Sequence, residues 1–306
     1  MKKILVIGAS GFVGRHIVQA LLADGYPVRC LSRNPDLLKD VAATGCEIVK
    51  GDMSDLASMQ RALDGVGAVY VSINTIVPQP GSSAGQRFME VEATGLRNIA
   101  AACETNGVRR LIYVTSLGIK PDASSEWTRE RWKIQQTLLE TGLDVTVIQP
   151  GMICGVGGRG FDMVLSQATK SYALTLGGGR MKMRSIALGD LIYYLVGVLN
   201  EPRAYGQCYD VGCDDTYSIK QMIDVAADVF GRKPPTNIAI PMGLLSAVAP
   251  LIERMAKMPK GAFNGFVDGM KEDGIGDPMP IRAILPRPLR SFRQCVEQAA
   301  PDSGRP

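Results

Sequence analysis

Short apolar runs rich in β-branched residues alternate with longer amphipathic segments through the first half of the chain. The short runs predict strands, and the longer segments predict helices with one buried face. Six strands are expected, at Lys3 to Ile7, Pro27 to Ser32, Glu47 to Lys50, Ala68 to Ile73, Arg110 to Thr115 and Asp144 to Gln149. Such alternation is typical of parallel strands joined by crossover helices. The pattern therefore predicts an α/β fold with a doubly wound parallel sheet.

The predicted helices of this half show apolar positions at helical spacing, and glycines close two of them. The first helix turns Ile17, Val18, Leu21 and Leu22 inward and ends before Gly25. The second turns Val91, Leu96, Ile99, Ala100 and Cys103 inward and ends before Gly107. A third helix, from Trp132 to Thr141, precedes the sixth strand.

The pattern changes after Pro150, where the run GMICGVGGRG is too glycine-rich for a regular element. Beyond it we expect helices at Phe161 to Lys170, Leu188 to Leu199 and Ser218 to Phe230, a loop TLGGGRMK and a strand at Gln207 to Val211. We therefore expect a core at residues 1–150, a smaller lobe at 151–300 with elements that return to the core, and a disordered tail at 301–306. An apolar helix from Met242 to Met258 is either a pocket cover or an oligomer contact.

The composition fits a folded cytoplasmic protein. Hydrophobic residues make up 46% of the chain and charged residues 21%, which is too apolar for a disordered chain. The net charge of +4 is mild and its lysines and arginines are scattered, so nucleic-acid binding gains no support. Seven cysteines without a C-x-x-C pair favour a reducing compartment over disulfides or a zinc cluster.

Neither a leader nor a membrane span is expected from the apolar stretches. Glycines interrupt the N-terminal run MKKILVIGASG, so a strand is favoured over a signal peptide. The stretch from Ala239 to Ile252 contains two prolines and falls short of the ~20 residues that a spanning helix needs. His16 is the single histidine, so we expect no metal site and no histidine base.

A glycine-rich turn joins the first predicted strand to the first helix in KILVIGASGFVGRHIVQALL. Gly8 permits the tight turn, Gly11 lets the backbone approach a pyrophosphate, and Gly14 allows the helix to pack closely. The helix N-terminus then presents amides and a positive dipole end to the anion. Ser10, Phe12 and Val13 belong to the same turn. This context predicts a Rossmann-type dinucleotide site.

The second strand and the third carry the residues expected around the adenosine. Ser32 stands where an NAD-preferring site carries an acid, and Arg33 follows it, which favours a 2′-phosphate and hence NADP(H). Asp52 is expected near the adenine amino group, with Met53 beside the ring. Asp52 can equally cap the helix that begins at Leu56.

These residues resemble the atypical and extended short-chain dehydrogenase/reductases, in particular the NmrA-like branch. The resemblance covers essentially the whole chain and is carried by GASGFVG, GDMSD, VSIN, RRLIYVTSLG, WKIQQTLLETGLDVTVIQPG, RSIALGDL and YDVG. It implies the fold and dinucleotide binding, with Ser72 and Pro150 beside the cofactor. It does not imply one reaction, because the branch includes reductases, epimerases, redox sensors and an accessory subunit of a respiratory complex.

The resemblance also implies a catalytic pattern from which this chain departs. Family members with the full pattern use a serine and a Y-x-x-x-K pair, and here Ser116 and Lys133 match the serine and the lysine. Arg129 stands at the tyrosine position, and a guanidinium stays protonated and cannot act as a general acid. Asp190 is expected to cap a helix that begins at Leu191, which is a structural role.

Two function hypotheses follow from a cofactor site that lacks the tyrosine. The first is an NADPH-dependent reductase of a carbonyl or conjugated C=C group, with the proton from Lys133 or water. The second is a non-catalytic NADP(H)-binding sensor or assembly protein, and a sugar-nucleotide epimerase is disfavoured. The substrate is expected to be small and hydrophobic, and the protein to be a monomer or homodimer. The expected pocket lining is Ile76, Val77, Trp127, Trp132, Met152, Phe161 and Met183.

Overall fold

A seven-stranded parallel sheet forms the centre of the molecule. The computed structural model describes residues 2–73, 88–255 and 261–300. In the sheet the strands follow the order β10-β6-β5-β4-β1-β2-β3. Their bounds are β1 Lys3–Ile7, β2 Val28–Ser32, β3 Glu47–Lys50, β4 Val66–Val71, β5 Arg110–Val114, β6 Asp144–Pro150 and β10 Gln207–Val211. All six neighbouring pairs are parallel, so the carboxyl ends of the strands share one edge.

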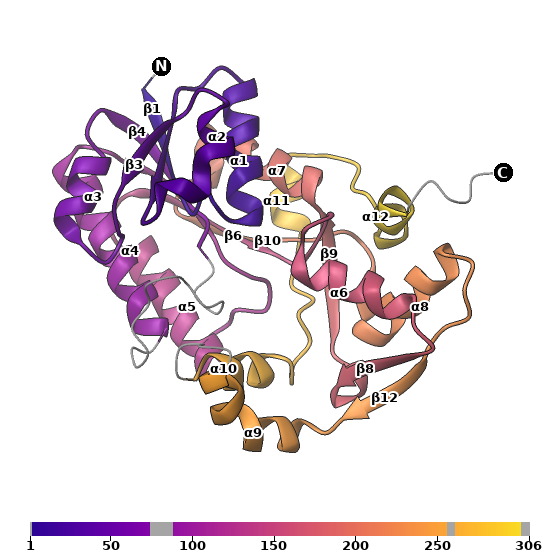
Figure 1. Cartoon of the computed structure of the whole chain (residues 1–306). Helices are drawn as coiled ribbons and strands as arrows, with labels where there is room; N and C mark the ends of the chain where they lie inside the picture. The colour runs from indigo at the N-terminus through magenta and orange to yellow at the C-terminus, as the bar shows by residue number, and fades with distance from the viewer. Residues whose placement is uncertain (1, 74–87, 256–260, 301–306) are drawn as a thin grey trace.

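Helices cover both faces of this sheet (Figure 1). On one face lie α1 Phe12–Ala23, α7 Leu188–Gly197 and α11 Met279–Ile284, and on the other α3 Leu56–Ala62, α4 Phe88–Thr105 and α5 Glu126–Leu139. The short elements η1 Pro35–Leu38 and α2 Lys39–Ala42 follow β2. Two separate apolar cores result, because a parallel sheet buries both faces under its crossover helices.

A third apolar core lies in the second half of the chain. Its helices are α6 Arg159–Ala168, α8 Ile219–Val229 and α12 Phe292–Ala299, packed with the small sheet β11 Thr216–Ser218, β9 Lys182–Ala187 and β7 Met152–Cys154. A two-stranded sheet pairs β8 Tyr172–Leu176 with β12 Thr236–Ile240. The other described elements of this half are the turns η2 Gly177–Gly179 and η3 Pro202–Ala204 and the helices α9 Met242–Met255 and α10 Ala262–Gly269.

The second half is tied to the main sheet at the end of α7. The buried Arg110 guanidinium on β5 donates to the Leu199 carbonyl at 2.9 Å, the Val198 carbonyl at 2.6 Å and the Thr146 hydroxyl at 2.8 Å. Burial lowers the pKa of Arg110 to about 10, so the group remains charged at neutral pH. Because three of its donors are satisfied, the buried charge stabilises the junction between β5, β6 and α7.

The fold confirms the α/β class and most predicted strands, with several differences in the helices and loops. The predicted loop TLGGGRMK instead contains the end of β8, the turn η2 and the start of β9. Helix α5 begins at Glu126, earlier than Trp132, because the Ser125 hydroxyl accepts the Thr128 amide and caps the helix. The apolar helix predicted to reach Met258 is described only to Met255. Among the described residues, no helix combines the length and apolarity needed to cross a bilayer.

Asp190 does not cap a helix, which corrects the expectation for this residue. Helix α7 begins at Leu188, so Asp190 lies inside its first turn and is 1% exposed. Its carboxylate accepts the Arg287 Nε and the Arg290 amide, both at 2.9 Å. Asp190 therefore fastens the segment before α12 to α7, and its role is structural.

Candidate functional site

The glycine turn after β1 is shaped by close backbone contacts. Gly8 has a φ of 92°, and a Cβ atom built there would lie 2.0 Å from the Ser72 carbonyl oxygen. The Ser72 amide donates to the Ile7 carbonyl at 2.9 Å, which holds the ends of β1 and β4 together. A Cβ at Gly14 would lie 2.1 Å from the Gly8 carbonyl oxygen. Only glycine fits at these two positions, because in each case the obstructing atom belongs to the backbone.

The N-terminus of α1 fits a diphosphate. Its N-cap is Gly11, which supplies no side-chain hydrogen bond, and the first turn carries no acidic residue. The Gly11 amide donates to the Gly8 carbonyl at 2.9 Å and closes the turn. The first helical amides are therefore left for an anion, with the positive end of the helix dipole behind them.

The Phe12 ring links this turn to the glycine-rich segment after β7. Cβ atoms built at Gly155 and Gly158 would lie 3.2 Å and 3.1 Å from ring atoms of Phe12. The ring also meets His16 edge to face, with ring centroids 5.4 Å apart. The glycines beyond β7 thus lie against the start of α1, next to the proposed phosphate position.

At the end of β2, the Ser32 side chain is bonded to the local backbone. Its hydroxyl donates to the Asn34 carbonyl at 2.8 Å and accepts the Asn34 amide at 3.2 Å. Arg33 follows with an exposed side chain. This turn sets the direction of the chain where an adenosine ribose is expected to lie, and the 2′-phosphate role of Arg33 stays a prediction.

Arg15 is a second cation in this region that the sequence analysis missed. From α1 its Nε donates to the Ser10 carbonyl at 3.3 Å, and another nitrogen donates to the Leu37 carbonyl at 3.0 Å. It also forms an ion pair with Asp40. Arg15 therefore fastens the glycine turn to the segment after β2. Arg15 could have been predicted to lie near the glycine turn, because it follows Gly11 by only four residues in the predicted first helix.

Two aspartates follow β3, and the structure shows which of them caps α3. Asp55, and not Asp52, caps α3, since its carboxylate accepts the Ala57 and Ser58 amides at 3.2 Å and 3.1 Å. Asp52 accepts the Ser54 amide at 2.9 Å in a local turn, so the capping alternative for Asp52 is wrong. Its contact with adenine remains a prediction.

Met53 lies under α4. A Cβ at Gly95 would approach the Met53 Cε to 2.2 Å, and the Asn98 side-chain amide donates to the Met53 carbonyl at 3.0 Å. The glycine on α4 thus makes room for the thioether. These contacts hold the loop after β3 against α4, where the predicted contact with the adenine ring would have to form.

The carboxyl ends of β5 and β6 bring two predicted residues together. The Thr115 amide donates to the Ile148 carbonyl and the Leu117 amide to the Pro150 carbonyl, both at 2.9 Å. Ser116, half-buried between them, therefore lies beside the Pro150 turn. A Cβ at Gly151 would lie 2.3 Å from the Arg184 carbonyl oxygen, so the chain passes tightly under β9 as it leaves the sheet.

Lys133 and Arg129 lie away from the buried side of α5. The Lys133 side chain is exposed. The Arg129 guanidinium donates to the Ala123 carbonyl at 2.5 Å and the Ser124 carbonyl at 2.7 Å, so it closes the loop before the helix. No tyrosine occurs on α5. The catalytic roles assigned to Ser116 and Lys133 stay predictions.

A buried charge cluster occupies the inward side of α5. Arg131, with 6% of its side chain exposed, pairs with the fully buried Glu92 of α4 at 2.8 Å. The Tyr113 hydroxyl of β5 donates to the same carboxylate. Burial, followed by the Glu92 charge, raises the pKa of Tyr113 well above its usual value, so this phenol is a poor proton donor.

Trp127 extends this cluster toward α10. The Arg131 guanidinium lies over the Trp127 ring, 5.1 Å from its centre. Cβ atoms built at Gly265 and Gly269 of α10 would lie 3.3 Å and 3.1 Å from Trp127. The inward positions of α5 repeat at Thr128, Arg131, Gln135 and Leu138. Helical spacing could have revealed this side, but three of the four residues are polar and gave no hydrophobic signal.

Phe161 corrects one part of the predicted pocket lining. It is fully buried and meets Phe292 edge to face with centroids 6.1 Å apart, so it belongs to the core of the second half. Trp127, Trp132, Met152 and Met183 keep partial exposure, whereas Ile76 and Val77 lie outside the described residues.

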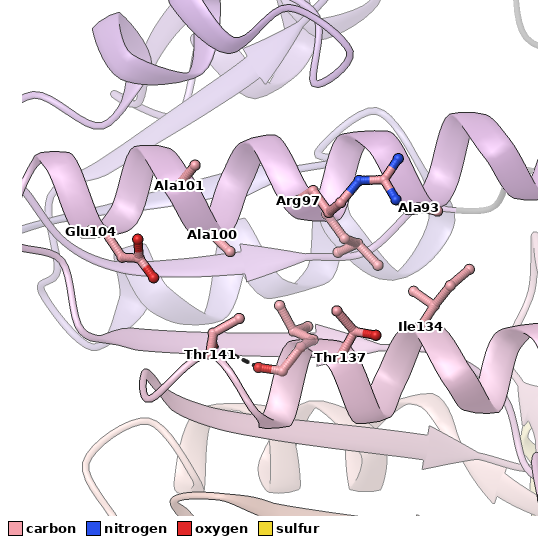
Figure 2. A pocket seen from close by; sticks show the side chains of 10 residues that line it. Ala93, Arg97, Ala100, Ala101, Glu104, Ile134, Thr137 and Thr141 are labelled. Carbon is pink, nitrogen blue, oxygen red and sulfur yellow. Dashed lines mark hydrogen bonds between the residues drawn. The ribbon is translucent and has the colours of Figure 1, made fainter.

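One groove of about 250 Å³ lies away from the strand ends, between α4 and α5. Figure 2 shows side chains of the two helices facing one another across it, including Ala93, Ala100, Ile134 and Thr137. Its lining comes from α4, α5 and Thr141 and includes no residue of the glycine turn or of α1, so the groove is not part of the dinucleotide site.

Comparisons with known proteins agree with this geometry. Residues 8–202 match a family model described as NAD(P)H-binding. A (4-alkanoyl-5-oxo-2,5-dihydrofuran-3-yl)methyl phosphate reductase from Streptomyces griseus is 36% identical over 148 residues, which cover 48% of this chain and 46% of that protein, so the match spans about half of each. An NAD(P)H azoreductase from Xenophilus azovorans is 25% identical over 310 residues, covering 97% and 98% of the two chains.

Similarity to solved structures supports the same fold. The triphenylmethane reductase of Citrobacter sp., solved with NADP(H), superposes with a TM-score of 0.74 at 17% identity and covers 97% of this chain and 100% of that one. At this level of identity the likeness concerns the fold. The family match over residues 8–202 covers more than half of the chain, so the chain belongs to the NAD(P)H-binding family.

Proposed function

We propose that this chain is an NADPH-dependent reductase of a carbonyl or conjugated C=C group in a small, hydrophobic substrate, within the NmrA-like branch. The observation that carries the proposal is the uncapped N-terminus of α1, set in a turn where Gly8 and Gly14 admit no side chain. Ser116 lies at the neighbouring strand ends, where a substrate would meet the nicotinamide.

The preference for NADP(H) rests on the end of β2. Ser32 has no charge to repel a 2′-phosphate, and the exposed Arg33 guanidinium matches phosphate geometry. Arg15 fixes the glycine turn relative to this segment through its contacts with Ser10 and Leu37. A rigid spacing between the diphosphate position and the 2′-phosphate position favours NADPH over NADH.

Bound NADPH supplies a hydride, and the chain supplies orientation and a proton. The Ser116 hydroxyl donates a hydrogen bond to the substrate oxygen and polarises the acceptor. The proton comes from Lys133 or from water, since Arg129 is committed to the Ala123 and Ser124 carbonyls. The names of the Streptomyces and Xenophilus relatives, both reductases, support this class of reaction.

The direct test is whether the protein consumes NADPH when candidate substrates are added. Purified protein is mixed with NADPH and a panel of enones, enals, quinones and aromatic aldehydes, and the loss of NADPH absorbance is followed. For a substrate found this way, Lys133→Met should lower kcat about 100-fold if the lysine donates the proton, and Lys170→Met should not. If the protein binds NADPH but consumes it with no member of the panel, the proposal that it is a reductase is refuted.

The second candidate is a non-catalytic NADP(H)-binding sensor or assembly protein of the cytoplasm, acting as a monomer or homodimer. The observation that favours it is the inward side of α5, where Arg131 is already neutralised by Glu92 and the helix itself carries no tyrosine. A sensor would bind NADPH with the same affinity in the Lys133→Met variant and show no turnover in either form. Light scattering of the purified protein distinguishes monomer from dimer.

A further inference from the structure

A second cavity, of about 340 Å³, lies in the second half of the chain between η2, the start of α9 and the end of α10. Its apolar wall consists of Leu176, Met181, Met242 and Met270, and its charged rim includes Arg180, Lys271 and Asp273. Methionine side chains are flexible and adapt to apolar ligands of different shapes. Figure 1 shows α9 and α10 on one side of this region and β8 and β12 on the other.

The rim is built on a rigid turn of three glycines. Gly177, Gly178 and Gly179 all have positive φ, at 57°, 79° and 64°, a conformation that side-chain-bearing residues rarely adopt. The Asn237 side-chain amide donates to the Gly178 carbonyl at 3.1 Å, and the Thr175 hydroxyl donates to Asn237 at 2.6 Å. These bonds fix the backbone that leads into Arg180 at the mouth of the cavity.

Of the charged groups at this mouth, Arg180 and Asp273 form no ion pair with another described residue. Lys271 forms an ion pair with Asp268 at 2.6 Å, and the Asp273 carboxylate accepts the Lys182 amide at 2.8 Å. Arg180 is exposed and has no ion pair or hydrogen bond with a side chain in the described part of the molecule. A planar guanidinium in this state is suited to a carboxylate or a phosphate.

The cavity lies next to the loop after β5 that carries Ser116, because Asp273 on its rim is followed by Gly274. Gly274 lies between β9 and the loop after β5, since its amide donates to the Lys182 carbonyl at 2.8 Å and a Cβ at Gly118 would lie 3.6 Å from its Cα. Arg180 stands just before β9, and β9 carries Arg184, whose carbonyl oxygen would lie 2.3 Å from a Cβ built at Gly151.

We propose that this cavity binds the anionic end of the substrate, so that the substrate is an elongated apolar molecule with a carboxylate or phosphate group. Arg180 pairs with the anion, and the three methionines enclose the adjoining apolar chain. The reducible group then lies at the ends of β5 and β6, beside Ser116. This inference rests on the proposed reductase for the identity of the ligand as a substrate.

Saturated probes test the binding site without requiring a reaction. Decanoate, decyl phosphate and decanol are titrated into the protein with NADP+ present, and their affinities are measured by calorimetry. In the unmodified chain both anions should bind more tightly than decanol. Arg180→Gln should weaken both anions about fivefold and leave decanol unchanged, because a partly exposed ion pair is screened by water.

Two matched variants separate charge from apolar contact. Lys170→Gln removes an exposed cation from the same half of the chain and should leave all three affinities unchanged. Met242→Ala should weaken decanol and the anions alike. A larger loss for decyl phosphate than for decanoate in Arg180→Gln would identify phosphate as the preferred anion.

Equal affinity of the anions for Arg180→Gln and the unmodified chain overturns the inference, as does anion binding no tighter than that of decanol. A different result would refute the proposed function: the protein binds NADPH but turns over no carbonyl or enone. Because anion binding and NADPH consumption are measured separately, one proposal can fail while the other stands.

Discussion

Replacing Gly14 by alanine tests the close approach between α1 and the glycine turn. The added Cβ would lie 2.1 Å from the Gly8 carbonyl oxygen and 2.7 Å from its carbon. Ordinary contact begins at 3.4 Å, so the start of the helix must recede by about 1.3 Å. Backbone atoms cannot rotate away as a side chain would, and the displacement must be shared by α1 and β1.

Two magnitudes compete in this variant. Alanine is a better helix former than glycine by up to about 1 kcal/mol, which alone would stabilise the protein. Overpacking of a close contact costs about 1 to 3 kcal/mol, so we expect a net loss in the free energy of unfolding. The shifted amides also lose at least one hydrogen bond to the diphosphate, worth about 1.5 to 3 kcal/mol, which weakens NADPH binding about tenfold or more.

The assay is a fluorescence titration of NADPH with the folded fraction monitored by circular dichroism. The matched control is Gly243→Ala on α9, where a Cβ meets no heavy atom within 4 Å. The control should bind NADPH normally and be no less stable than the unmodified chain. An NADPH affinity of Gly14→Ala equal to that of the unmodified protein would refute the assignment of the α1 terminus to the diphosphate.

Three further predictions concern charges. Arg33→Ser should weaken NADPH about tenfold and leave NADH unchanged in the same titration, because only NADPH carries the 2′-phosphate. Glu92→Gln should lower the free energy of unfolding in urea by about 3 kcal/mol, since the buried Arg131 loses its charge partner. Hydrogen bonds, first those from Ser124, lower the pKa of Glu272 to about 2 from 4.5, so its stabilisation is present above pH 4.5 and fades toward pH 2. Glu272→Gln should therefore lower Tm at neutral pH and have no effect near pH 2.

Each of these has a contrary result. Equal losses for NADPH and NADH in Arg33→Ser would place the arginine away from the 2′-phosphate. A Glu92→Gln protein as stable as the original would mean that Arg131 finds another partner. A Tm difference for Glu272→Gln that persists at pH 2 would show that its carboxylate charge does not stabilise the fold.

The main sheet was predictable because strand, turn and helix signals are local. β1 and β3 coincide with their predicted runs, and the Gly8 turn follows from its place between a strand and a helix. The position of β10 beside β6 was not predictable, since pairing between distant segments leaves no local pattern. The pair β8 and β12 was missed for the same reason, because the glycines after β8 indicate a loop.

The candidate site shows the same division. The turn of Gly8, Gly11 and Gly14 was predictable from its place between a strand and a helix, whereas the Arg131 and Glu92 pair depends on how α4 meets α5. The capping role of Asp55 could have been found, because an N-cap stands directly before the first helical residue. Asp52 stands three residues earlier in the same GDMSD motif, and its carboxylate accepts the Ser54 amide.

The edge strand β10 limits how proteins of this design can be recombined. It pairs with β6 in register from Gln207 with Thr146 to Val211 with Pro150, although it is encoded far downstream. A chimera that takes its second half from another parent must therefore bring a compatible edge strand, or expose the backbone of β6 to aggregation. Laboratory exchange of substrate preference is then easier through single residues and loops than through whole segments.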